Sequence, residues 1–420
     1  MRTDTLEAAR AMDAADPLSA MRQSFLFPPH PSGNPPVYLC GNSLGLQPKG
    51  VRQRVNDELD HWAKHGVEGH FEGDNPWFSY HEPLSAPMAH VVGAQPHEVV
   101  VMNALTVNLH LMMVSFYRPT PKRHKILIEA SAFPSDLYAV ASQARMHGYD
   151  PKEAVVEMHP REGEETIRTE DIEALLERDG EQFALVMFGG VNYYTGQAFE
   201  MERITAAGHK AGAMVGFDLA HAAGNLHLKL HDWGVDFGVW CSYKYLNSGP
   251  GGVAGCFVHD RHGMNPDLVR MAGWWGNDPT TRFEMPREFV PQRGAGGWQL
   301  SNAPVLPMAS LSASLELFTQ ATMPALRERS ERMTAYLVAL IDGMGADRFR
   351  LITPRDPSQR GCQVSIQTLV DGRALFEALG QQGVTCDFRR PDVIRVAPVP
   401  LYNSFEDIWR FAQILREAVG

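Results

Sequence analysis

Short apolar segments with strand character alternate with helical patterns through the middle of the chain. The strand-like segments are EVVVMN, HKILIEA, FALVMFGG, AMVGFDLAH, DFGVWCSYKY and GVAGCFVHD. Most are apolar at consecutive positions rather than at every second one, so both faces of each strand must be covered. The alternation predicts an α/β fold whose large domain, over residues 64–305, is a mostly parallel sheet covered by helices.

The pattern changes after QLSNAP. A long helical stretch is followed by short strands and helices, which predicts a smaller α+β domain over residues 306–420. Within it, SFED (Ser404 to Asp407) predicts a capping box at the start of the last helix. Residues 1–63 contain many prolines and glycines until a helix begins near Gly50, and we expect this segment to pack on the small domain.

The composition limits the kinds of partner that the chain can have. A net charge of -11 argues against nucleic-acid binding as the main function. No apolar run approaches the length needed to span a membrane, and the N-terminus lacks the apolar core of a signal peptide. The five cysteines are odd in number and include no C-x-x-C pair, which favours a reducing compartment. We therefore expect a cytoplasmic protein without a nucleic-acid or membrane partner.

Lys244 stands near the end of DFGVWCSYKY, between two tyrosines. Taken alone, it would be a lysine at a strand end that reaches solvent. However, Asp218 ends another very apolar run, VGFD, and a buried carboxylate needs a cationic or donating partner. Because ligands of open α/β sheets bind at the carboxyl ends of the strands, we expect Lys244 and Asp218 to lie together there.

One cofactor needs both groups. Pyridoxal 5'-phosphate is held by a lysine as a Schiff base, and an acid keeps its ring nitrogen protonated. Thr106, early in a helix after a strand, offers a hydroxyl and free amides to the phosphate, although it could equally be an ordinary N-cap. Phe133 could stack on the ring or be a core aromatic, and His221 could contact the cofactor. These residues predict pyridoxal 5'-phosphate as the cofactor.

Other patterns do not carry chemistry. His61 and His65 have a spacing that can bind zinc on a helix, but no third ligand is evident, and HLKLH (His227 to His231) is no stronger. The glycine-rich GPGG and GAGG lack the Rossmann spacing, and the chain has no Walker A or G-x-S-x-G sequence. We therefore predict no metal site.

Longer motifs carry a resemblance to a known family. They include YLCGNSLGLQPKG, MNALTVNLHLMM, AFPSD, GFDLAHAAGN, LHDWGVDF, CSYKYLN, QLSNAP and IRVAPVPLYNSF. From about Tyr38 to its C-terminus, the chain resembles kynureninases. That resemblance implies a fold type I pyridoxal-phosphate enzyme, active as a homodimer with its sites at the interface. It also implies hydrolysis of L-kynurenine to anthranilate and L-alanine, in tryptophan catabolism or NAD biosynthesis.

The resemblance assigns cofactor contacts to particular residues. Lys244 would form the Schiff base, Asp218 would face the ring nitrogen, and Phe133 would stack on the ring. Further cofactor contacts would come from Leu105, Thr106, Pro134, Ser135, Asp136, His221, Tyr243 and Ser43, and from Trp274 and Asn302 of the second subunit. Tyr243, beside Lys244, is also expected to relay a proton to the substrate's β-carbon, which requires a pKa below the usual value of about 10.

The substrate contacts follow from the same resemblance. Arg395 would bind the α-carboxylate, His70 would contact the aromatic end, and the segment with Trp275 and Asn277 would touch the substrate ring. The strand VIRVAPVP contains no acidic residue, so the partner of a buried Arg395 is either the ligand or an acid elsewhere, such as on the large domain.

The chain departs from the family pattern at three positions. Gly189 stands where members often have serine, and Trp275 and Asn277 stand where some carry phenylalanine and histidine. Because Asn277 offers a weaker, uncharged contact, we expect L-kynurenine to be preferred over 3-hydroxy-L-kynurenine.

Two alternatives remain open from the sequence. A related enzyme, such as a cysteine desulfurase or an aminotransferase, would use the same Lys244 and Asp218, and a desulfurase would also need a mobile nucleophilic cysteine. Cys362 is the candidate by position, although RGCQVS looks like the start of a strand. A non-catalytic binding protein is the second alternative, and the intact Lys244 and Asp218 argue against it.

Overall fold

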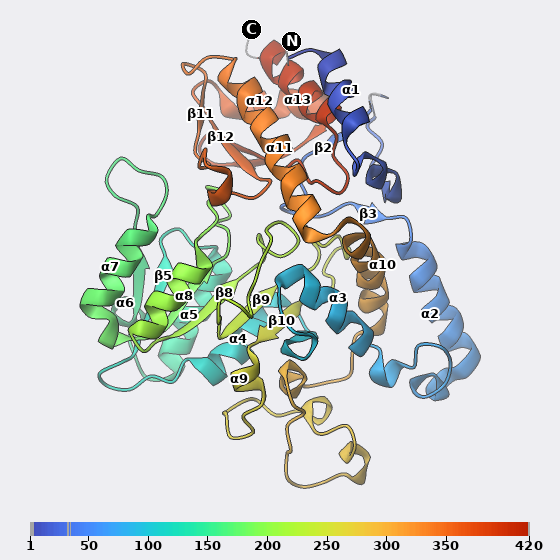
Figure 1. The fold of residues 1–420 in the computed structure, drawn as a ribbon, viewed down its shortest axis with the longest axis vertical. Coiled ribbons are helices and arrows are strands. Elements are labelled where there is room, and N and C mark those ends of the chain that lie inside the picture. The colour runs from blue at the N-terminus through green and yellow to red at the C-terminus, as the bar shows by residue number, and fades with distance from the viewer. Residues whose placement is uncertain (1–3, 32, 34, 419–420) are drawn as a thin grey trace.

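The computed structural model describes residues 4–31, 33 and 35–418. Figure 1 shows a larger region built around one sheet and a smaller region above it that carries both ends of the chain. None of the helices in the described residues combines the length and the apolar character that crossing a bilayer requires.

The large sheet has seven strands within the described residues. In spatial order they are β4 (Val99–Val101), β10 (Gly255–Val258), β9 (Phe237–Trp240), β8 (Met214–Asp218), β7 (Phe183–Gly189), β5 (Lys125–Glu129) and β6 (Val155–Met158). Strands β9, β8, β7, β5 and β6 run parallel, whereas β10 is antiparallel to both β9 and β4. The prediction of an α/β fold with a mostly parallel sheet is therefore confirmed.

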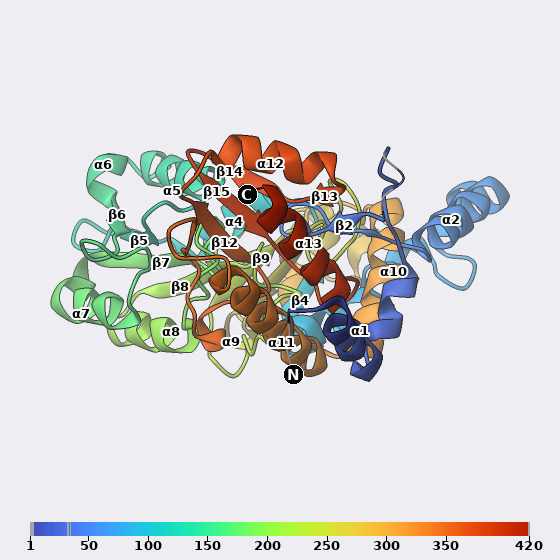
Figure 2. The same ribbon diagram turned by 90° about the horizontal axis from the view of Figure 1, so that it is seen from above.

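Helices cover both faces of this sheet, which explains why its strands are apolar at consecutive positions. Ile126 and Ile128 of β5 belong to one hydrophobic cluster, whereas Leu127, between them, belongs to another. In Figure 2, α5 and α6 lie on one side of the strands, and α7 and α8 lie on the other. The helices of this region are α3 (Glu82–Val92), α4 (Leu105–Phe116), α5 (Pro134–Met146), α6 (Pro151–Ala154), α7 (Thr169–Asp179), α8 (Met201–Lys210) and α9 (Asp260–Gly263).

The smaller region is an antiparallel sheet backed by helices. Its four described strands are, in spatial order, β11 (Phe349–Leu351), β12 (Val364–Thr368), β15 (Val393–Val396) and β14 (Asp387–Arg389). Its helices are α11 (Met323–Asp342), α12 (Gly372–Gln381) and α13 (Phe405–Ala418). The predicted capping box of α13 is confirmed: the Asp407 amide donates to the Ser404 hydroxyl (3.0 Å), and the Ser404 amide donates to the Asp407 carboxylate (3.2 Å).

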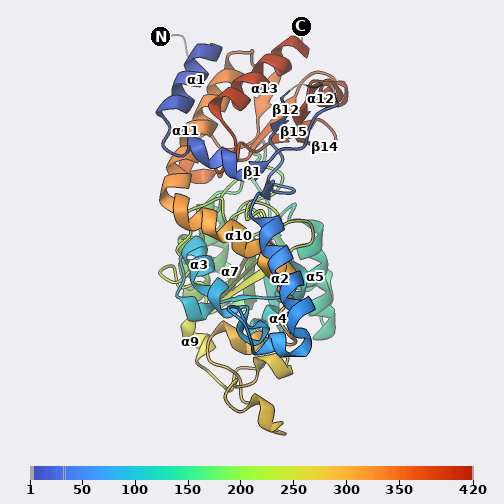
Figure 3. The ribbon, with the colours of Figure 1, turned by 90° about the vertical axis from the view of Figure 1, so that its right-hand side faces the viewer.

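The N-terminal segment is shared between the two regions. Helix α1 (Leu6–Ala15) packs on α13, as Figure 3 shows, and β2 (Val37–Tyr38) pairs in parallel with β13 (Val384–Thr385). Strand β1 (Phe25–Leu26) pairs with β3 (Gln47–Pro48). Helix α2 (Val51–His65) instead packs along α10 (Val305–Ala321). Leu311 and Leu315 of α10 are buried in the core of the large region, so α2 belongs with that region rather than with the small one. The division at residues 63 and 305 stays a prediction.

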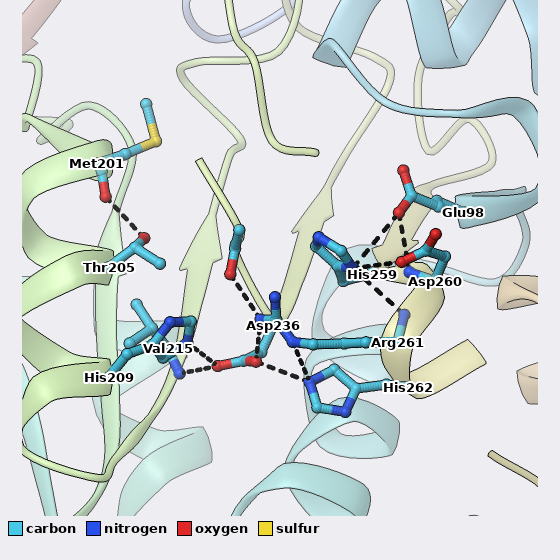
Figure 4. Close-up of polar contacts among 11 residues, drawn as sticks. Glu98, Met201, Thr205, His209, Val215, Asp236, His259, Asp260, Arg261 and His262 are labelled. Carbon is cyan, nitrogen blue, oxygen red and sulfur yellow. Dashed lines mark hydrogen bonds and ion pairs between the residues drawn. The ribbon is translucent and has the colours of Figure 1, made fainter. Parts of the chain in front are cut away.

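A buried acid fixes the amino-terminal ends of the strands. Asp236 directly precedes β9, and its carboxylate accepts hydrogen bonds from the Val215 amide (2.7 Å) and from Arg261 (2.5 Å). His209 and His262 also contact it, at 2.9 and 2.7 Å (Figure 4). Burial would raise the pKa of Asp236, but these hydrogen bonds outweigh burial and hold the pKa well below its usual range. The network joins α8, β8 and α9 at the sheet edge where the strands begin.

Candidate active site

A pocket lies at the opposite edge, where β5, β7 and β8 end. The register pairs Gly189, the last residue of β7, with Asp218, the last residue of β8. The residues that line the pocket are Leu105, Thr106, Glu129, Phe133, Ser135, Asp136, Gly189, Val191, Tyr193, Asp218, Ala220, His221, Tyr243 and Lys244. Nine of the residues predicted from the sequence to contact the cofactor are thus brought together in one chain.

Lys244 reaches the pocket from a turn rather than from a strand. Strand β9 ends at Trp240, so the expectation that the strand continues to Lys244 is wrong. The Asn247 amide closes the turn on the Lys244 carbonyl (3.1 Å), and Asn247 adopts the left-handed conformation, with φ of 52°. The Lys244 Nζ lies 3.1 Å from His221 Nε2 and 5.9 Å from the centre of the Phe133 ring.

Two buried carboxyls face this amine. Asp218 is 8% exposed and accepts a hydrogen bond from the Ala220 amide (2.7 Å), and Asp136 lies in the first turn of α5. Burial raises the pKa of both carboxyls, and the charge of Asp218 raises that of Asp136 further. The pKa of Asp136 is thus shifted toward the protonated form, whereas the Ala220 amide and Lys244 partly offset the rise at Asp218.

His221 and Tyr243 are both held neutral. Burial, followed by the charge of Lys244, lowers the pKa of His221 well below its usual value, so the imidazole can accept a hydrogen bond from Lys244. Burial raises the pKa of Tyr243 well above 10. The expectation that Tyr243 ionises more easily than a free tyrosine is therefore wrong, because burial desolvates the phenol and the neighbouring Cys241, followed by Asp218, raises its pKa further.

An anion-binding cradle borders the pocket. The N-cap of α4 is Ala104, whose side chain cannot satisfy the first amides of the helix, so Thr106 is not the N-cap. The Thr106 hydroxyl lies 2.8 Å from the Ser135 hydroxyl at the start of α5. Free amides and two hydroxyls at a helix N-terminus suit a phosphate group.

The residues present fit pyridoxal phosphate. Besides the cradle, the pocket offers an amine, a carboxylate and an aromatic face, since Phe133 is 45% exposed. Asp136 Oδ1 and His221 Nδ1 are among the buried polar atoms of the described residues that have no hydrogen-bond partner, and at this place a bound ligand would supply one.

Several predicted contacts do not line this pocket. Ser43 and Asn302 are exposed, Trp274 is 40% exposed, and His70 Nδ1 contacts the Val67 carbonyl at 3.0 Å. Pro134 begins α5 just outside the lining. In Figure 1 the segment around residues 264–304 projects at the bottom of the large region.

Trp275 and Asn277 are buried within that projecting segment. The Asn277 Oδ1 accepts a hydrogen bond from the Val290 amide (2.8 Å), and the Asn277 carbonyl accepts one from Arg282 (2.9 Å). In a single chain, therefore, these side chains hold the segment together and do not reach the Lys244 pocket.

Arg395 has a protein partner. It is 1% exposed in β15 and pairs with Asp387 on the neighbouring strand β14 (2.5 Å), so its acid comes from the small sheet and not from the large domain. Arg389 shares the same carboxylate at 3.1 Å. Both guanidinium groups lie 5.8 Å from the ring of Tyr193, which lines the pocket. Two cations on one anion leave excess positive charge beside the pocket.

Sequence reasoning missed four lining residues: Glu129, Val191, Tyr193 and Ala220. Glu129 had a usable signal, because KILIE ends in an acid just as VGFD does before the pocket residue Asp218. Tyr193 follows β7 in a loop, and its contacts with Arg395 and Phe133 depend on the packing of the two regions.

A second group of ionisable residues lies away from the pocket. Ligand-type atoms of Glu98, His231, His259 and Asp260 lie within 4.8 Å of one another. The buried Glu98 accepts a hydrogen bond from the Asp260 amide (2.8 Å), and His259 Nδ1 lies 2.8 Å from Asp260 (Figure 4). Glu98 also lies 2.9 Å from His231 Nδ1. Mutual hydrogen bonds account for this group, so we assign it a structural role.

Comparisons with known proteins identify one family. Residues 326–415 match a family model described as "Kynureninase C-terminal domain". Proteins named kynureninase from Myxococcus xanthus and Koribacter versatilis are 58% and 57% identical, each over 98% of this chain and 97% of its own length. One from Xanthomonas campestris is 54% identical over 98% of each chain.

The solved structures with a similar fold are more distant in sequence. A cysteine desulfurase from Thermococcus onnurineus has a TM-score of 0.74 and 16% identity, over 94% of this chain and 96% of its own. A mutant of the cystine lyase C-DES, with glycine covalently linked to its pyridoxal phosphate, has a TM-score of 0.76 and 16% identity, over 94% and 98%. At this identity the similarity shows the shared fold, that of fold type I pyridoxal-phosphate enzymes.

Proposed function

The chain belongs to the kynureninase family, and from that premise we propose which of its residues carry out the reaction. The protein is a hydrolase that cleaves a carbon–carbon bond: L-kynurenine and water give anthranilate and L-alanine, with pyridoxal 5'-phosphate as cofactor. The observation that carries the assignment of residues is the meeting of Lys244, Asp218 and the α4 cradle in one pocket.

The chain's own groups divide the work of holding the cofactor. When bound, pyridoxal phosphate accepts the electron pair that is released at the substrate's α-carbon. Lys244 would hold the cofactor covalently at rest, and Asp218 would keep a proton on its ring nitrogen. Phe133 covers one face of the ring, and Thr106 and Ser135 bind the phosphate together with the first amides of α4.

Proton transfer falls to Lys244. With its Nζ not bonded to the cofactor, Lys244 would take the proton from the substrate's α-carbon. His221, neutral and 3.1 Å away, orients the amine. Tyr243, a neutral phenol, acts as a hydrogen-bond donor in the pocket.

Arg395 recognises the substrate's carboxylate. Its planar guanidinium matches a carboxylate with two parallel hydrogen bonds, and Arg389 adds a second cation beside it. Asp387 keeps Arg395 in place before the substrate arrives.

We also propose that the active form is a homodimer with its sites at the interface. Exposed aromatic side chains, among them Trp62, Phe71, Trp274 and Phe283, offer apolar surface to a second copy. Ser43, His70, Asn302 and the segment with Trp275 and Asn277 would then reach the pocket across that interface. All five cysteines lie in the described part of the chain and are free thiols, in keeping with a cytoplasmic location.

A desulfurase-like activity, suggested by the fold neighbours, lacks its nucleophile. Cys362 is fully buried, and burial raises the pKa of its thiol to about 12. Its amide donates to the Asn225 side chain (2.9 Å), which fixes it in the protein interior. A mobile, reactive thiolate is not available at this position.

The experiment is a pair of assays on the holoenzyme. We expect anthranilate to form from L-kynurenine, followed by its fluorescence, and no sulfide to form from L-cysteine. Comparing kcat/KM for L-kynurenine and 3-hydroxy-L-kynurenine tests the expected preference for the first. A protein that binds pyridoxal phosphate but releases neither product would contradict the assignment.

A further inference from the structure

Glu129 occupies the floor of the cofactor pocket. It is the last residue of β5, 3% exposed, and it lines the pocket together with Asp218. Both of its carboxyl oxygens accept a hydrogen bond from the Gly189 amide, at 3.0 and 3.1 Å. Because Gly189 is paired with Asp218 in the register, the three residues stand on three adjacent strand ends.

The space at Gly189 is taken by this carboxyl. A Cβ atom on residue 189 would lie 2.8 Å from Glu129 Oε1, which is closer than real Cβ atoms approach. Glycine at this position thus lets the carboxyl lie against the backbone. Glycine at position 189 is therefore what makes room for the buried carboxyl of Glu129.

Charge is the second constraint on Glu129. The pocket holds three carboxyls, on Glu129, Asp136 and Asp218, against one lysine. Burial, with a smaller contribution from the charge of Asp218, outweighs the opposing hydrogen bonds from the Glu129 and Gly189 amides and raises the pKa of Glu129 to about 8. At neutral pH, Glu129 is therefore a neutral carboxyl in contact with the backbone.

We propose that Glu129 is a positioning residue. By accepting the hydrogen bond from the Gly189 amide, it fixes the end of β7 and so keeps Gly189 beside Asp218 at the place where the cofactor's ring binds. This inference rests on the proposed function, because it assumes that Asp218 faces the ring nitrogen. The neutral Glu129 leaves Asp218 as the carboxylate that meets the ring, with no second negative charge beside it.

Three variants separate the effect of the hydrogen bond between Glu129 and the Gly189 amide from the effect of the charge on the Glu129 carboxyl. Glu129→Gln keeps the shape and an acceptor for the Gly189 amide, and it stays neutral at every pH. Glu129→Ala removes that hydrogen bond, and Gly189→Ala pushes the carboxyl aside. The matched control is Glu98→Gln, which neutralises a fully buried acid outside the pocket.

The first readout is the affinity of each apoenzyme for pyridoxal phosphate, measured by absorbance titration without substrate. We expect Glu129→Ala and Gly189→Ala to weaken binding by about tenfold, the size expected for one buried hydrogen-bonded group. Glu129→Gln and Glu98→Gln should stay within about twofold of the wild type near pH 7. If both Glu129→Ala and Gly189→Ala bind pyridoxal phosphate with wild-type affinity, Glu129 is not a positioning residue for the cofactor site.

The second readout is the melting temperature of the apoenzyme between pH 5 and pH 9. A buried acid with a raised pKa binds more protons folded than unfolded, so its contribution to stability falls as pH rises toward about 8. Glu129→Gln has no group that titrates at this position, so its melting temperature should rise relative to that of the wild type as pH increases. If the two plots of melting temperature against pH are parallel, Glu129 is not a neutral carboxyl with a raised pKa. Neither readout involves turnover. A negative result for Glu129 can therefore be distinguished from a failure of the enzyme to cleave L-kynurenine.

Discussion

At the scale of single residues, the pocket assigns charge by environment rather than by residue type. Asp218 and Asp136 are both buried and both have raised pKa values, yet the Ala220 amide and Lys244 oppose the rise at Asp218, whereas the charge of Asp218 adds to the rise at Asp136. His221 is kept neutral by burial and by Lys244, so it can accept a hydrogen bond where a cation would repel the lysine. Shifted pKa values gathered in one cleft are typical of active sites.

Replacing Lys244 with alanine tests the covalent link to the cofactor. Lys244 is only half-buried in a turn, so the substitution should leave the fold intact. We expect loss of the visible absorbance band that marks attachment of the cofactor to lysine, together with loss of L-kynurenine turnover. A normal band in this variant would assign the link to another residue, and circular dichroism serves as the control for folding.

Replacing Asp218 with asparagine tests the partner of the ring nitrogen. The amide cannot hold a positive charge on the ring, so we expect kcat/KM to fall by about 10²–10³-fold or more, as for other strong electrostatic groups in active sites. The melting temperature of the apoenzyme should change little by comparison. Turnover near the wild-type value would contradict the role of Asp218.

Replacing Arg395 with lysine tests the recognition of the carboxylate. Lysine keeps the charge but loses the two-pronged geometry, so KM for L-kynurenine should rise about tenfold or more while cofactor content stays normal. The control is Arg350→Lys, at an exposed ion pair with Glu165. If KM is unchanged, the pair with Asp387 is the whole role of Arg395.

At the scale of secondary structure, the large sheet is fixed at one edge and functional at the other. The Asp236 network joins the starts of β8 and β9 to α8 and α9, whereas Asp218 and Lys244 follow the ends of the same strands. Rigid strands between the two edges hold the catalytic groups at fixed distances. Residues that stabilise the fold therefore lie at the starts of β8 and β9, and the proposed catalytic residues lie at the ends of the same strands.

Asp236→Asn tests the stabilising edge. We expect the free energy of unfolding at pH 7 to fall by about 2–3 kcal/mol, since charge-assisted hydrogen bonds are lost and Arg261 is partly exposed. The low pKa of Asp236 means that its contribution is present above about pH 4 and is lost as pH falls further, so the difference from the wild type should shrink below pH 4.

Melting curves from pH 3 to pH 7 measure this difference. The control is Asp232→Asn, an exposed acid a few residues away in the same loop. A difference that grows on acidification would mean that Asp236 is not the group that titrates.

The sequence predicted what local patterns encode. Consecutive apolar residues indicated strands covered on both faces, and Asp218 at the end of such a run marked the pocket. It could not show that Asp387 pairs with Arg395, because this contact depends on the register of β14 against β15. Nor could it show that the pKa of Tyr243 rises, because that shift comes mainly from burial in the assembled fold.

At the scale of the whole molecule, two of the residues predicted to contact the cofactor lie outside the pocket of their own chain. Trp274 and Asn302 lie away from it, on surface that a single copy leaves open. If they serve the pocket of a second copy in a twofold-symmetric dimer, each site needs groups from both chains.

Mixed dimers test this arrangement. Lys244→Ala and Asn302→Ala should each be nearly inactive alone, because each damages both sites of its homodimer. Random mixing after unfolding and refolding, or by co-expression, should restore about a quarter of the wild-type activity, since half of the dimers then have one intact site. No recovery, with dimers confirmed by sedimentation, would mean that Asn302 does not serve a partner's site.

The sharing of the small region between the two ends of the chain has a consequence for synthesis. Trp409 of α13 donates to the Asp4 carbonyl, although the two residues are 405 positions apart. A ribosome that adds 5–20 residues per second takes ~20–80 s over that distance. For most of this time Val37 and Leu39 have neither β13 nor α13 to cover them. The part of the protein made first is thus among the last to reach its native contacts, and a nascent chain stalled before α13 should be cut by proteases near its N-terminus.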